Sequence, residues 1–363
     1  MVCEVKIWWV VNILWLVSCN MQHWVHGEPQ VPCFFIFGDS LVDNGNNNGL
    51  ITLAKVNFPP YGIDFPDGPT GRFSNGRTMA DIIAELLGFD NYIPPFATAS
   101  NQDTLKGVNY ASGGAGIRNE SGQHLGARIS LDFQMRNHQT IVSRIANILG
   151  NNDSAAKYLS KCLYSVGMGS NDYINNYYLP NLYPTSHQYT PVQYAQILIQ
   201  QYTQQIMTLY KYGARKVALM GLGPIGCTPN EIARYGKNGS SCVEDINNSV
   251  QLFNSKLISL VDNLNTNLTD AKFIYVNYYA IASSDVSSLG FKVTNSACCG
   301  GGKNNGEIPC LPLQIPCKKR SEYLFWDAFH PTEAANVIVA ARAYNAHTPS
   351  DTYPIDISHL IQL

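Results

Sequence analysis

The fold of this chain is most tightly restricted by short apolar segments that alternate with longer segments of helical periodicity. Short runs that are apolar on both faces are typical of strands in a parallel sheet covered by helices on both sides. The sequence therefore predicts a three-layer α/β sandwich built on a parallel five-stranded sheet. The predicted strands are Cys33–Phe37, Val108–Ala111, Leu163–Gly167, Lys216–Met220 and Phe273–Asn277.

Three segments between these strands carry apolar residues at three- and four-residue steps, which predicts amphipathic helices packed on the sheet. They cover residues 78–87, 192–212 and 246–264. Gly213 directly follows the second segment and is placed to end that helix. We assign the apolar stripes of these helices to the hydrophobic core and to no catalytic or binding function.

Two long segments rich in glycine, proline and asparagine, residues 57–76 and 296–316, are predicted to be loops. Long loops often carry binding surface, so we expect these two to form walls of a cleft. No linker, repeat or block of like charges divides the chain. A single domain is therefore expected over residues 28–363, a length that single α/β domains can reach.

Residues 1–27 predict a secretory signal peptide that is cleaved near Gly27. Lys6 provides a basic start before the apolar segment Ile7–Cys19, and small residues occur at the expected cleavage point. An uncleaved membrane anchor is the alternative, because residues 7–27 contain no charged side chain. The polar residues after Cys19 leave the apolar part shorter than the roughly 20 residues that a membrane span needs. We therefore expect cleavage and a secreted, extracellular protein with no later membrane span.

Charged side chains make up only 14% of the chain, well below the roughly 25% of an average domain. The formal net charge of −2 is unchanged by cleavage, because residues 1–27 contain one acid and one base. Such a charge argues against a nucleic-acid partner. Asn-x-Ser/Thr sequences are candidate glycosylation sites, and glycans on them would keep the surface hydrated. They are Asn119, Asn152, Asn238, Asn247 and Asn267.

Eight of the ten cysteines remain once residues 1–27 are removed. An even number of cysteines in an exported chain indicates disulfides. The sequence does not decide the pairing, but Cys227 with Cys242 and pairs within the cluster from Cys298 to Cys317 are local possibilities. The alternative is a four-thiolate zinc site in that cluster. Its first two cysteines are adjacent, however, and lack the gap of two to four residues that such sites usually show.

The first predicted strand runs into Gly38-Asp39-Ser40, which would place Ser40 at the carboxyl edge of the sheet. Glycine permits a sharp turn there, and ligands of open α/β sheets bind outside that edge. The alternative is that Asp39, Ser40 and the asparagines after them only cap a turn or a helix. A nucleophilic role for Ser40 also requires a base, an acid that orients the base, and donors for an oxyanion.

Asp327 precedes His330 by three residues near the end of the chain. This spacing can place a carboxylate beside one imidazole nitrogen and leave the other nitrogen free to face a nucleophile. Alternatively, His330 is a packed residue at a helix start, since Pro331 fits the beginning of a helix. The apolar face expected for that helix is Ala334, Val337, Ile338 and Ala341. Among the other histidines after residue 27, only His359 has an acid close before it, Asp356.

Two further loops could supply donors for an oxyanion. Ser112-Gly113-Gly114 follows the predicted strand that ends at Ala111, and glycine lets a backbone N–H approach a ligand closely. The segment Gly167–Asp172 contains Asn171, whose side-chain amide would lie at the same edge. Each loop alone is an ordinary strand-to-helix turn. Together with Ser40, they place candidate donors after three strands.

These motifs, in this order along the chain, resemble those of the SGNH hydrolase superfamily, and specifically of its plant GDSL esterase/lipase branch. The motifs are Gly38-Asp39-Ser40, Gly113, Gly169-Ser170-Asn171-Asp172 and Asp327-Ala328-Phe329-His330. The resemblance also includes residues 57–88, residues 212–227 and the Cys298-Cys299 pair, so it covers nearly the whole chain after residue 27. It implies a flavodoxin-like SGNH hydrolase fold and a carboxylic ester hydrolase that needs neither a metal nor an organic cofactor.

The resemblance further implies a role for each site residue. Ser40 would be the nucleophile, His330 the general base and later acid, and Asp327 the residue that orients the imidazole. The Ser40 N–H, the Gly113 N–H and the Asn171 amide would form the oxyanion hole, although the sequence does not choose between Gly113 and the glycine after it. The substrate would be an ester or a lipid, and a plant protein of this kind would be located in the cell wall. Neither the natural substrate nor the oligomeric state follows from the sequence.

Two other sequence patterns are typical of different enzyme folds. Residues 221–226 match the dinucleotide-binding fingerprint Gly-x-Gly-x-x-Gly, but Pro224, Cys227 and Pro229 predict a loop where that fingerprint needs a helix. The Gly-x-Ser-x-Gly sequence of the α/β-hydrolase fold does not occur in the chain.

Two other functions use the same residues differently. An acyltransferase would pass the acyl group from the serine to an alcohol instead of to water. A secreted binding or defence protein would keep the fold without catalysis, but loss of activity usually removes Ser, Asp or His, and all three remain here. The sequence therefore predicts a secreted esterase or lipase that acts through an acyl-serine intermediate.

Overall fold

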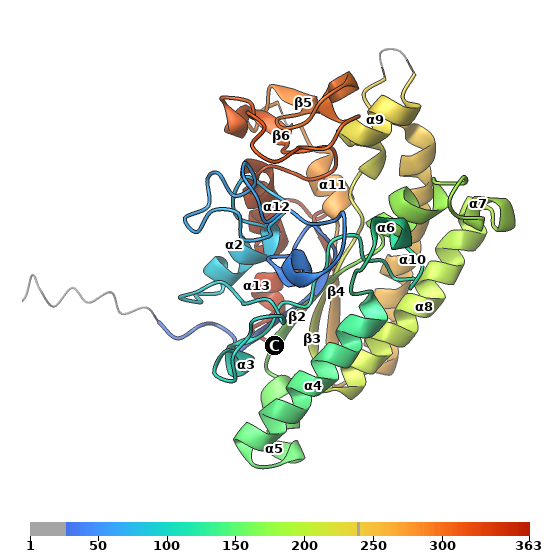
Figure 1. Cartoon of the computed structure of the whole chain (residues 1–363). Coiled ribbons are helices and arrows are strands. Elements are labelled where there is room, and N and C mark those ends of the chain that lie inside the picture. The colour runs from blue at the N-terminus through green and yellow to red at the C-terminus, as the bar shows by residue number, and fades with distance from the viewer. Residues whose placement is uncertain (1–26, 238–239, 286) are drawn as a thin grey trace, which may run out of the picture.

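The computed structural model describes residues 27–237, 240–285 and 287–363 (Figure 1). The predicted signal peptide, apart from Gly27, and the candidate glycosylation site Asn238 lie outside the described residues. No helix in the described part of the chain is long and apolar enough to cross a membrane.

A five-stranded sheet forms the centre of the molecule, in the order β1-β2-β3-β4-β7. Its strands are β1 (Phe34–Gly38), β2 (Leu163–Gly167), β3 (Lys216–Met220), β4 (Lys272–Val276) and β7 (Thr352–Tyr353). The first four are parallel, with Gly38 beside Gly167 and Val166 beside Leu219, whereas β7 is antiparallel to β4. The carboxyl ends of β1 to β4 therefore meet at one edge. Four of the five predicted strands are confirmed to within one residue.

The predicted strand Val108–Ala111 is wrong as a strand, although its position is informative. The segment runs beside β1, and the Tyr110 N–H donates to the Ile36 carbonyl (2.8 Å). Only Asn109 forms a bridge to β1. The Gly38 N–H, which would continue this pattern by donating to the Tyr110 carbonyl, donates instead to the Gln134 side-chain oxygen (3.0 Å). The antiparallel β7 is the fifth strand instead.

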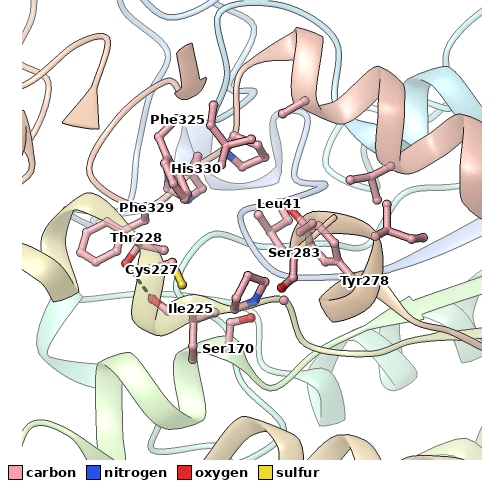
Figure 2. A pocket seen from close by; sticks show the side chains of 18 of the residues that line it. Leu41, Ser170, Ile225, Cys227, Thr228, Tyr278, Ser283, Phe325, Phe329 and His330 are labelled. Carbon is pink, nitrogen blue, oxygen red and sulfur yellow. Dashed lines mark hydrogen bonds between the residues drawn. The ribbon is translucent and has the colours of Figure 1, made fainter. Parts of the chain in front are cut away.

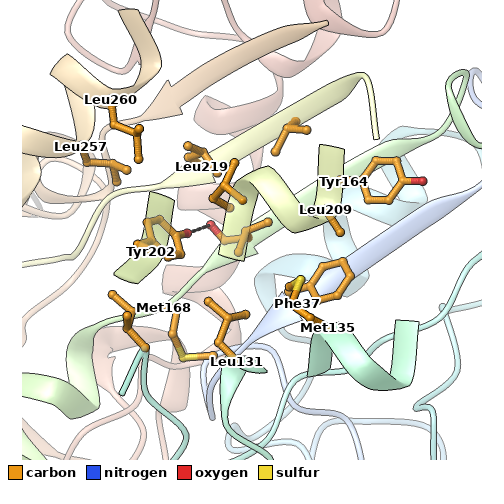
Figure 3. Close-up of a cluster of buried hydrophobic side chains, with 14 of the residues drawn as sticks. Phe37, Leu131, Met135, Tyr164, Met168, Tyr202, Leu209, Leu219, Leu257 and Leu260 are labelled. Carbon is orange, nitrogen blue, oxygen red and sulfur yellow. Dashed lines mark hydrogen bonds between the residues drawn. The ribbon is translucent and has the colours of Figure 1, made fainter. Parts of the chain in front are cut away.

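Helices cover both faces of the sheet, because successive strand residues point to opposite sides. The first face carries α4 (Leu131–Leu149), α5 (Asn152–Leu159), α8 (Pro191–Lys211) and α10 (Glu244–Asn267), and the second carries α2 (Met79–Leu86), α12 (Glu333–Tyr344) and α13 (Ile357–Leu360). Phe37 and Tyr164 belong to the core of the first face (Figure 3), and Phe34 and Ile36 to the core of the second. The predicted three-layer sandwich is confirmed (Figure 1).

Local sequence explains where two of the three predicted helices begin and where one of them ends. α8 begins with a capping box, in which the Thr190 side chain accepts the Gln193 N–H and the Gln193 side chain accepts the Thr190 N–H. α2 begins with the same arrangement between Thr78 and Asp81. Gly213, with a φ of +107°, follows the end of α8 as predicted.

The remaining elements are short. The short helices are α3 (Asp103–Lys106), α6 (Ser170–Asp172), α7 (Thr185–Gln188), α9 (Pro229–Tyr235) and α11 (Tyr278–Ala282). Turns of 3-10 helix cover Asn46–Gly49, Gln123–Leu125, Ile225–Cys227, Lys303–Asn305 and Arg320–Glu322, and one π-helical turn covers Tyr173–Tyr177. A separate two-stranded parallel pair is formed by β5 (Val293–Ala297) and β6 (Tyr323–Phe325).

The apolar face predicted for the helix after His330 is wrong. α12 begins at Glu333, two residues after Pro331, and the Thr332 side chain caps it by accepting the Ala335 N–H. The side chains that it buries are Ala335, Asn336, Val339, Ala340 and Ala343. The predicted residues Ala334, Val337, Ile338 and Ala341 lie on its partly exposed side. α12 itself carries small apolar residues on most of its faces, so the spacing of these residues does not identify the buried face.

All eight cysteines of the described chain form disulfides. The pairs are Cys33–Cys162, Cys227–Cys242, Cys298–Cys317 and Cys299–Cys310. The local pairing considered from the sequence is therefore confirmed for Cys227, Cys242 and the C-terminal cluster. Because these sulfurs are oxidised to disulfides, the cluster has no thiolates for the alternative zinc site.

The candidate glycosylation sites differ in accessibility. Asn119, Asn152 and Asn267 are exposed. Asn247 is only 3% exposed, and its side-chain oxygen accepts the Gly226 N–H (2.9 Å). A glycan on Asn247 would need this packed side chain to leave the core, so we withdraw Asn247 from the candidates.

Candidate active site

Ser40 follows β1 directly, at the carboxyl edge of the sheet. The chain turns at Gly38, where a Cβ atom would lie 2.6 Å from Val42 and 3.0 Å from the Gly167 carbonyl oxygen, so that glycine is required. The Asp39 carboxylate accepts the Leu41 N–H (3.0 Å) and holds the turn. Burial raises the pKa of Asp39 to about 6.

A chain of hydrogen bonds connects Ser40 to His330 and Asp327. His330 Nε2 lies 2.8 Å from Ser40 Oγ, across 290 residues of sequence. His330 Nδ1 lies 2.7 Å from Asp327 Oδ1 and 2.9 Å from Oδ2. Asp327 Oδ1 also accepts the N–H groups of Phe329 and His330, at 2.9 Å each, which locks the turn between the two residues. His330, as predicted from the sequence, is thus within hydrogen-bonding distance of both Ser40 and Asp327.

Asp327 is held in its charged form. Burial alone would raise the pKa of this carboxyl, but the neighbouring His330 and the hydrogen bonds from His330, Tyr61 and the Phe329 N–H together lower the pKa below its usual value. An ionised carboxylate beside Nδ1 keeps the proton on that nitrogen, which leaves Nε2 as the acceptor facing Ser40.

Sequence reasoning missed two aromatic residues that support this group. Tyr61 is buried, and its hydroxyl donates to Asp327 Oδ2 at 2.6 Å. The Phe73 ring packs against the His330 ring, with 4.9 Å between ring centroids. Both come from the loop 57–76. That segment was part of the resemblance, but Tyr61 is one of 21 tyrosines, and only its contact with Asp327 distinguishes it.

Two of the expected oxyanion donors are available at the same edge. Asn171 lines the pocket beside Ser40, and its amide nitrogen donates to the Ala115 carbonyl (2.8 Å). An amide nitrogen carries two hydrogens, so one remains for a ligand. The Asn171 side-chain oxygen accepts from Asn175 (2.6 Å), which orients the amide. The Ser40 backbone N–H has no acceptor among the described residues.

Gly113 is placed differently from expectation. Its N–H donates to Asp43 Oδ2 at 2.9 Å. Gly113 is not among the described residues that line the pocket beside Ser40. The N–H of Gly114 has no acceptor among the described residues. Asp43 also accepts the N–H groups of Gly45 and Asn46, and burial raises its pKa to about 6. Asp43 therefore connects the loop that contains Gly113 and Gly114 to the 3-10 turn that follows Ser40.

The last residue of the Gly-x-Asn-Asp motif is also structural. Asp172 is fully buried and accepts the N–H groups of Ile117 (2.8 Å) and Arg118 (3.0 Å) and the Ser121 hydroxyl (2.6 Å). Burial raises its pKa to about 6. These bonds tie the loop after Gly114 to α6, the element that carries Asn171.

A pocket of about 330 Å³ opens beside Ser40 and His330 (Figure 2). Its walls come from residues 39–41, 170–174, 223–228, 241–242, 278–284, 289–294 and 324–331 and from α12. Side chains such as Leu41, Ile225, Phe325 and Phe329 make the walls mainly apolar. Residues 57–76 and 296–316 contribute none of the described lining, so the prediction that these two loops wall the cleft is wrong. The segment that matches the dinucleotide fingerprint forms part of the wall instead.

The charge of the lining is low. Apart from Tyr278, the ionisable side chains among the described lining residues are Asp39 and His330, because Cys227 and Cys242 form a disulfide. The described lining contains no lysine or arginine. The pocket is therefore suited to a neutral, largely apolar group next to a Ser-His-Asp arrangement.

Comparison with known proteins gives matches along most of the chain. A family model described as GDSL-like Lipase/Acylhydrolase matches residues 34–343. Two Arabidopsis thaliana proteins named GDSL esterase/lipase, At1g29670 and At1g29660, are 57% and 55% identical to this chain over 359 residues, which is 98% of each chain compared. The solved structure of phospholipase A1 from Streptomyces albidoflavus NA297 gives a TM-score of 0.33 at 12% identity, covering 84% of this chain and 94% of that one.

Proposed function

This chain belongs to the GDSL-like lipase/acylhydrolase family and is a carboxylic ester hydrolase, and on that basis we propose that it works through an acyl-enzyme formed on Ser40. The observation that carries the proposal is the 2.8 Å contact between Ser40 Oγ and His330 Nε2 at the edge of an apolar pocket. The 2.7 Å contact of His330 Nδ1 with Asp327 supports it, because it orients the base.

The reaction begins when Ser40 Oγ attacks the ester carbonyl carbon and His330 Nε2 takes the hydroxyl proton. Asp327 stabilises the imidazolium that forms. The tetrahedral intermediate collapses when the C–O bond to the alcohol breaks, and His330 returns the proton to the leaving alcohol. Water then attacks the acyl-serine with His330 as base, and the same steps release the carboxylic acid and restore Ser40.

The negative charge on the carbonyl oxygen needs donors that are already in place. We assign this role to the Ser40 N–H and to the free amide hydrogen of Asn171, each of which typically lowers the barrier by about 2.7–4 kcal/mol. Gly113 can act as a third donor only when its N–H leaves Asp43.

The lining restricts the substrate to esters whose buried group is uncharged. With no described lysine or arginine in the wall, a carboxylate or phosphate would enter the pocket without a partner. A pocket of about 330 Å³ is in the size range of sites that accept small organic groups. We propose neutral esters with an aliphatic or aromatic group of that size, including acyl lipids.

We also propose that the protein is exported. The predicted signal peptide, four disulfides and exposed glycosylation candidates such as Asn152 support an oxidising, extracellular location. Because its relatives are proteins of a plant, Arabidopsis thaliana, we propose the cell wall as the place of action.

The direct test is Ser40→Ala with a soluble p-nitrophenyl ester as substrate. We expect kcat to fall by about 10⁴-fold or more while the melting temperature stays within a few degrees of wild type. A fluorophosphonate probe should label the wild-type protein on Ser40 and leave the variant unlabelled. Turnover at the wild-type rate in the folded variant would refute the assignment. Free acid as the main product in the presence of added alcohol distinguishes hydrolysis from acyl transfer.

A further inference from the structure

The connection between β5 and β6 forms a loop that is closed by two disulfides. We call residues 298–317 the stapled loop, because Cys298 bonds to Cys317 and Cys299 to Cys310. Four large aliphatic side chains of this loop face solvent, with exposed fractions that reach 91%. They are Ile308 (48%), Leu311 (51%), Leu313 (79%) and Ile315 (91%).

Hydrogen bonds prevent these side chains from turning inward. The Gln314 N–H donates to the Leu311 carbonyl (3.1 Å), and the Leu311 N–H donates to the Gln314 side-chain oxygen (3.0 Å). The Gln314 side-chain nitrogen donates to the Gly300 carbonyl (2.6 Å), and the Leu313 N–H to the Pro59 carbonyl (2.8 Å). The hydrogen bonds therefore fix the loop in a conformation that exposes these side chains. A cluster of exposed apolar side chains in such a loop indicates an interaction surface.

Exposed basic residues occur within the stapled loop and directly after it. Lys303, Lys318 and Lys319 are exposed, and Lys319 is 73% exposed beside Glu322 at 3.4 Å. Residues 298–322 contain four basic and two acidic side chains, whereas the whole chain has a net charge of −2. One of the four, Arg320, is paired with Asp64 outside this segment (2.5 Å). This local positive charge favours an anionic partner.

The stapled loop is continuous with the wall of the active-site pocket. β5 contributes Thr294 to the lining, and β6 contributes Leu324 and Phe325. These two strands lie at one end of the molecule, at the top of Figure 1. A surface bound by the loop would therefore lie close to the pocket.

We propose that the stapled loop anchors the protein to the surface of anionic lipid assemblies. The aliphatic side chains enter the boundary between head groups and acyl chains, and the lysines contact the anionic head groups. Self-association would place the lysines of two copies against each other across a two-fold axis, which like charges oppose. The proposal goes beyond ester hydrolysis, because it requires no catalytic residue.

Vesicle co-sedimentation of the full mature protein tests the anchor. The lipids are phosphatidylcholine alone and an equal mixture of phosphatidylcholine and phosphatidylglycerol. We expect binding to the mixed vesicles that weakens with added salt. Leu313→Asp/Ile315→Asp should reduce the bound fraction about tenfold or more, because two aliphatic groups no longer enter the lipid. Lys318→Glu/Lys319→Glu should remove the preference for phosphatidylglycerol.

Leu182→Asp/Val192→Asp is the matched control, because these side chains are 59% and 55% exposed near α7, away from the stapled loop. This control should bind vesicles like the wild type. All variants should hydrolyse a soluble short-chain ester at wild-type rates. Failure of the wild type to bind mixed vesicles, or equal binding by the loop variant and the control, overturns the proposal. A dimer in solution that dissociates in Leu313→Asp/Ile315→Asp would assign the loop to self-association and also overturn it.

Vesicle binding and ester hydrolysis can fail separately. Protein that binds mixed vesicles through the loop but cleaves no ester would leave the anchor standing and refute the proposed mechanism. Protein that cleaves soluble esters but ignores vesicles would do the reverse.

Discussion

Two long loops of similar composition have opposite positions relative to the active site. Residues 57–76 lie against Asp327 and His330, to which they contribute Tyr61 and Phe73. The stapled loop makes no described hydrogen bond to either residue and exposes its apolar side chains to solvent. Glycine, proline and asparagine make both segments irregular, but the contacts that anchor each loop determine which side chains it buries.

This contrast separates the expected effects of substitutions. Substitutions of Asp327, and of Tyr61, which donates a hydrogen bond to it, should alter kcat. Changes in the stapled loop, and in α9 beneath it, should alter stability or surface binding while kcat for a soluble ester stays constant. Four variants test that separation.

Asp327→Asn should have the greatest effect. The amide cannot stabilise the imidazolium and favours the wrong His330 tautomer, so kcat should fall by about 10⁴-fold. Steady-state kinetics with a p-nitrophenyl ester measures the loss, and circular dichroism checks the fold. A decrease of less than tenfold would show that Asp327 does not act on His330 as the 2.7 Å contact indicates.

Removal of one of the two disulfides of the stapled loop should lower stability and leave catalysis unchanged. Cys299→Ser/Cys310→Ser opens a disulfide that spans 11 residues of sequence, and we expect a loss of about 2–3 kcal/mol in the free energy of unfolding. Denaturant titration measures this value. A parallel loss of kcat on a soluble ester at a temperature where the variant is folded would break the distinction between the two loops.

Tyr61→Phe should change kcat more weakly than Asp327→Asn. The variant loses the hydroxyl that donates to Asp327 Oδ2 and holds this carboxylate beside His330. The base is then oriented less well, so kcat should fall about tenfold with KM unchanged. The hydrogen bond from Tyr61 also helps to lower the pKa of Asp327. Without it the carboxylate attracts the imidazole proton more strongly, and the acidic limb of the kcat/KM profile should move to higher pH.

If Tyr61 has only a structural role, Tyr61→Phe would lower the melting temperature without moving the acidic limb of the kcat/KM profile. Tyr92→Phe is the control, because Tyr92 donates to the exposed Glu85 and not to the catalytic group. The control should keep both the wild-type pH profile and the wild-type kcat.

Glu231→Gln should have the smallest effect, confined to stability at high pH. Glu231 lies in α9, whose Asn230 donates to the Gly306 carbonyl of the stapled loop (2.8 Å). Neither Glu231 carboxylate oxygen has a partner among the described residues, and burial raises its pKa to about 7. The folded protein therefore holds this proton more tightly than the unfolded chain, where the pKa is ~4.3.

The contribution of this protonated Glu231 is complete below the unfolded pKa and is lost as pH rises through about 7. We expect Glu231→Gln to melt at a higher temperature than wild type at pH 8 and at nearly the same temperature at pH 4. Glu307→Gln, at an exposed position of the stapled loop, should match wild type at both pH values. An equal change at both pH values for Glu231→Gln would exclude a titration effect.

Sequence reasoning succeeded where the deciding interactions are local. The Thr190 capping box and Gly213 set the ends of α8, and the apolar run before Gly38 sets β1. It failed where neighbours distant in sequence decide. The face of α12 depends on which of its many small apolar residues meet the sheet. The pairing of Val108–Ala111 with β1 is interrupted because Gln134, a residue of α4, accepts the Gly38 N–H.

The candidate site shows the same division. Ser40, Asp327, His330 and Asn171 could be identified from short motifs, and the structure brings them to one edge of the sheet. Tyr61 could not, because no local pattern separates it from the other tyrosines. The pocket walls were also unpredictable, since they come from many separate segments that meet only in the folded chain.

Two Asp-x-x-His sequences show what each level of structure decides. In both, the aspartate accepts the backbone N–H of the histidine, at 2.9 Å for Asp327 and 3.0 Å for Asp356, and lies within 2.7 Å of the ring Nδ1. The three-residue spacing alone determines that contact, because a single turn closes it. Only tertiary packing decides that His330 meets Ser40, 290 residues away, whereas the His359 side chain is 63% exposed. The reason is that the contact between His330 and Ser40 depends on the order of the parallel strands and on how α12 packs against the sheet. A local motif encodes neither of these.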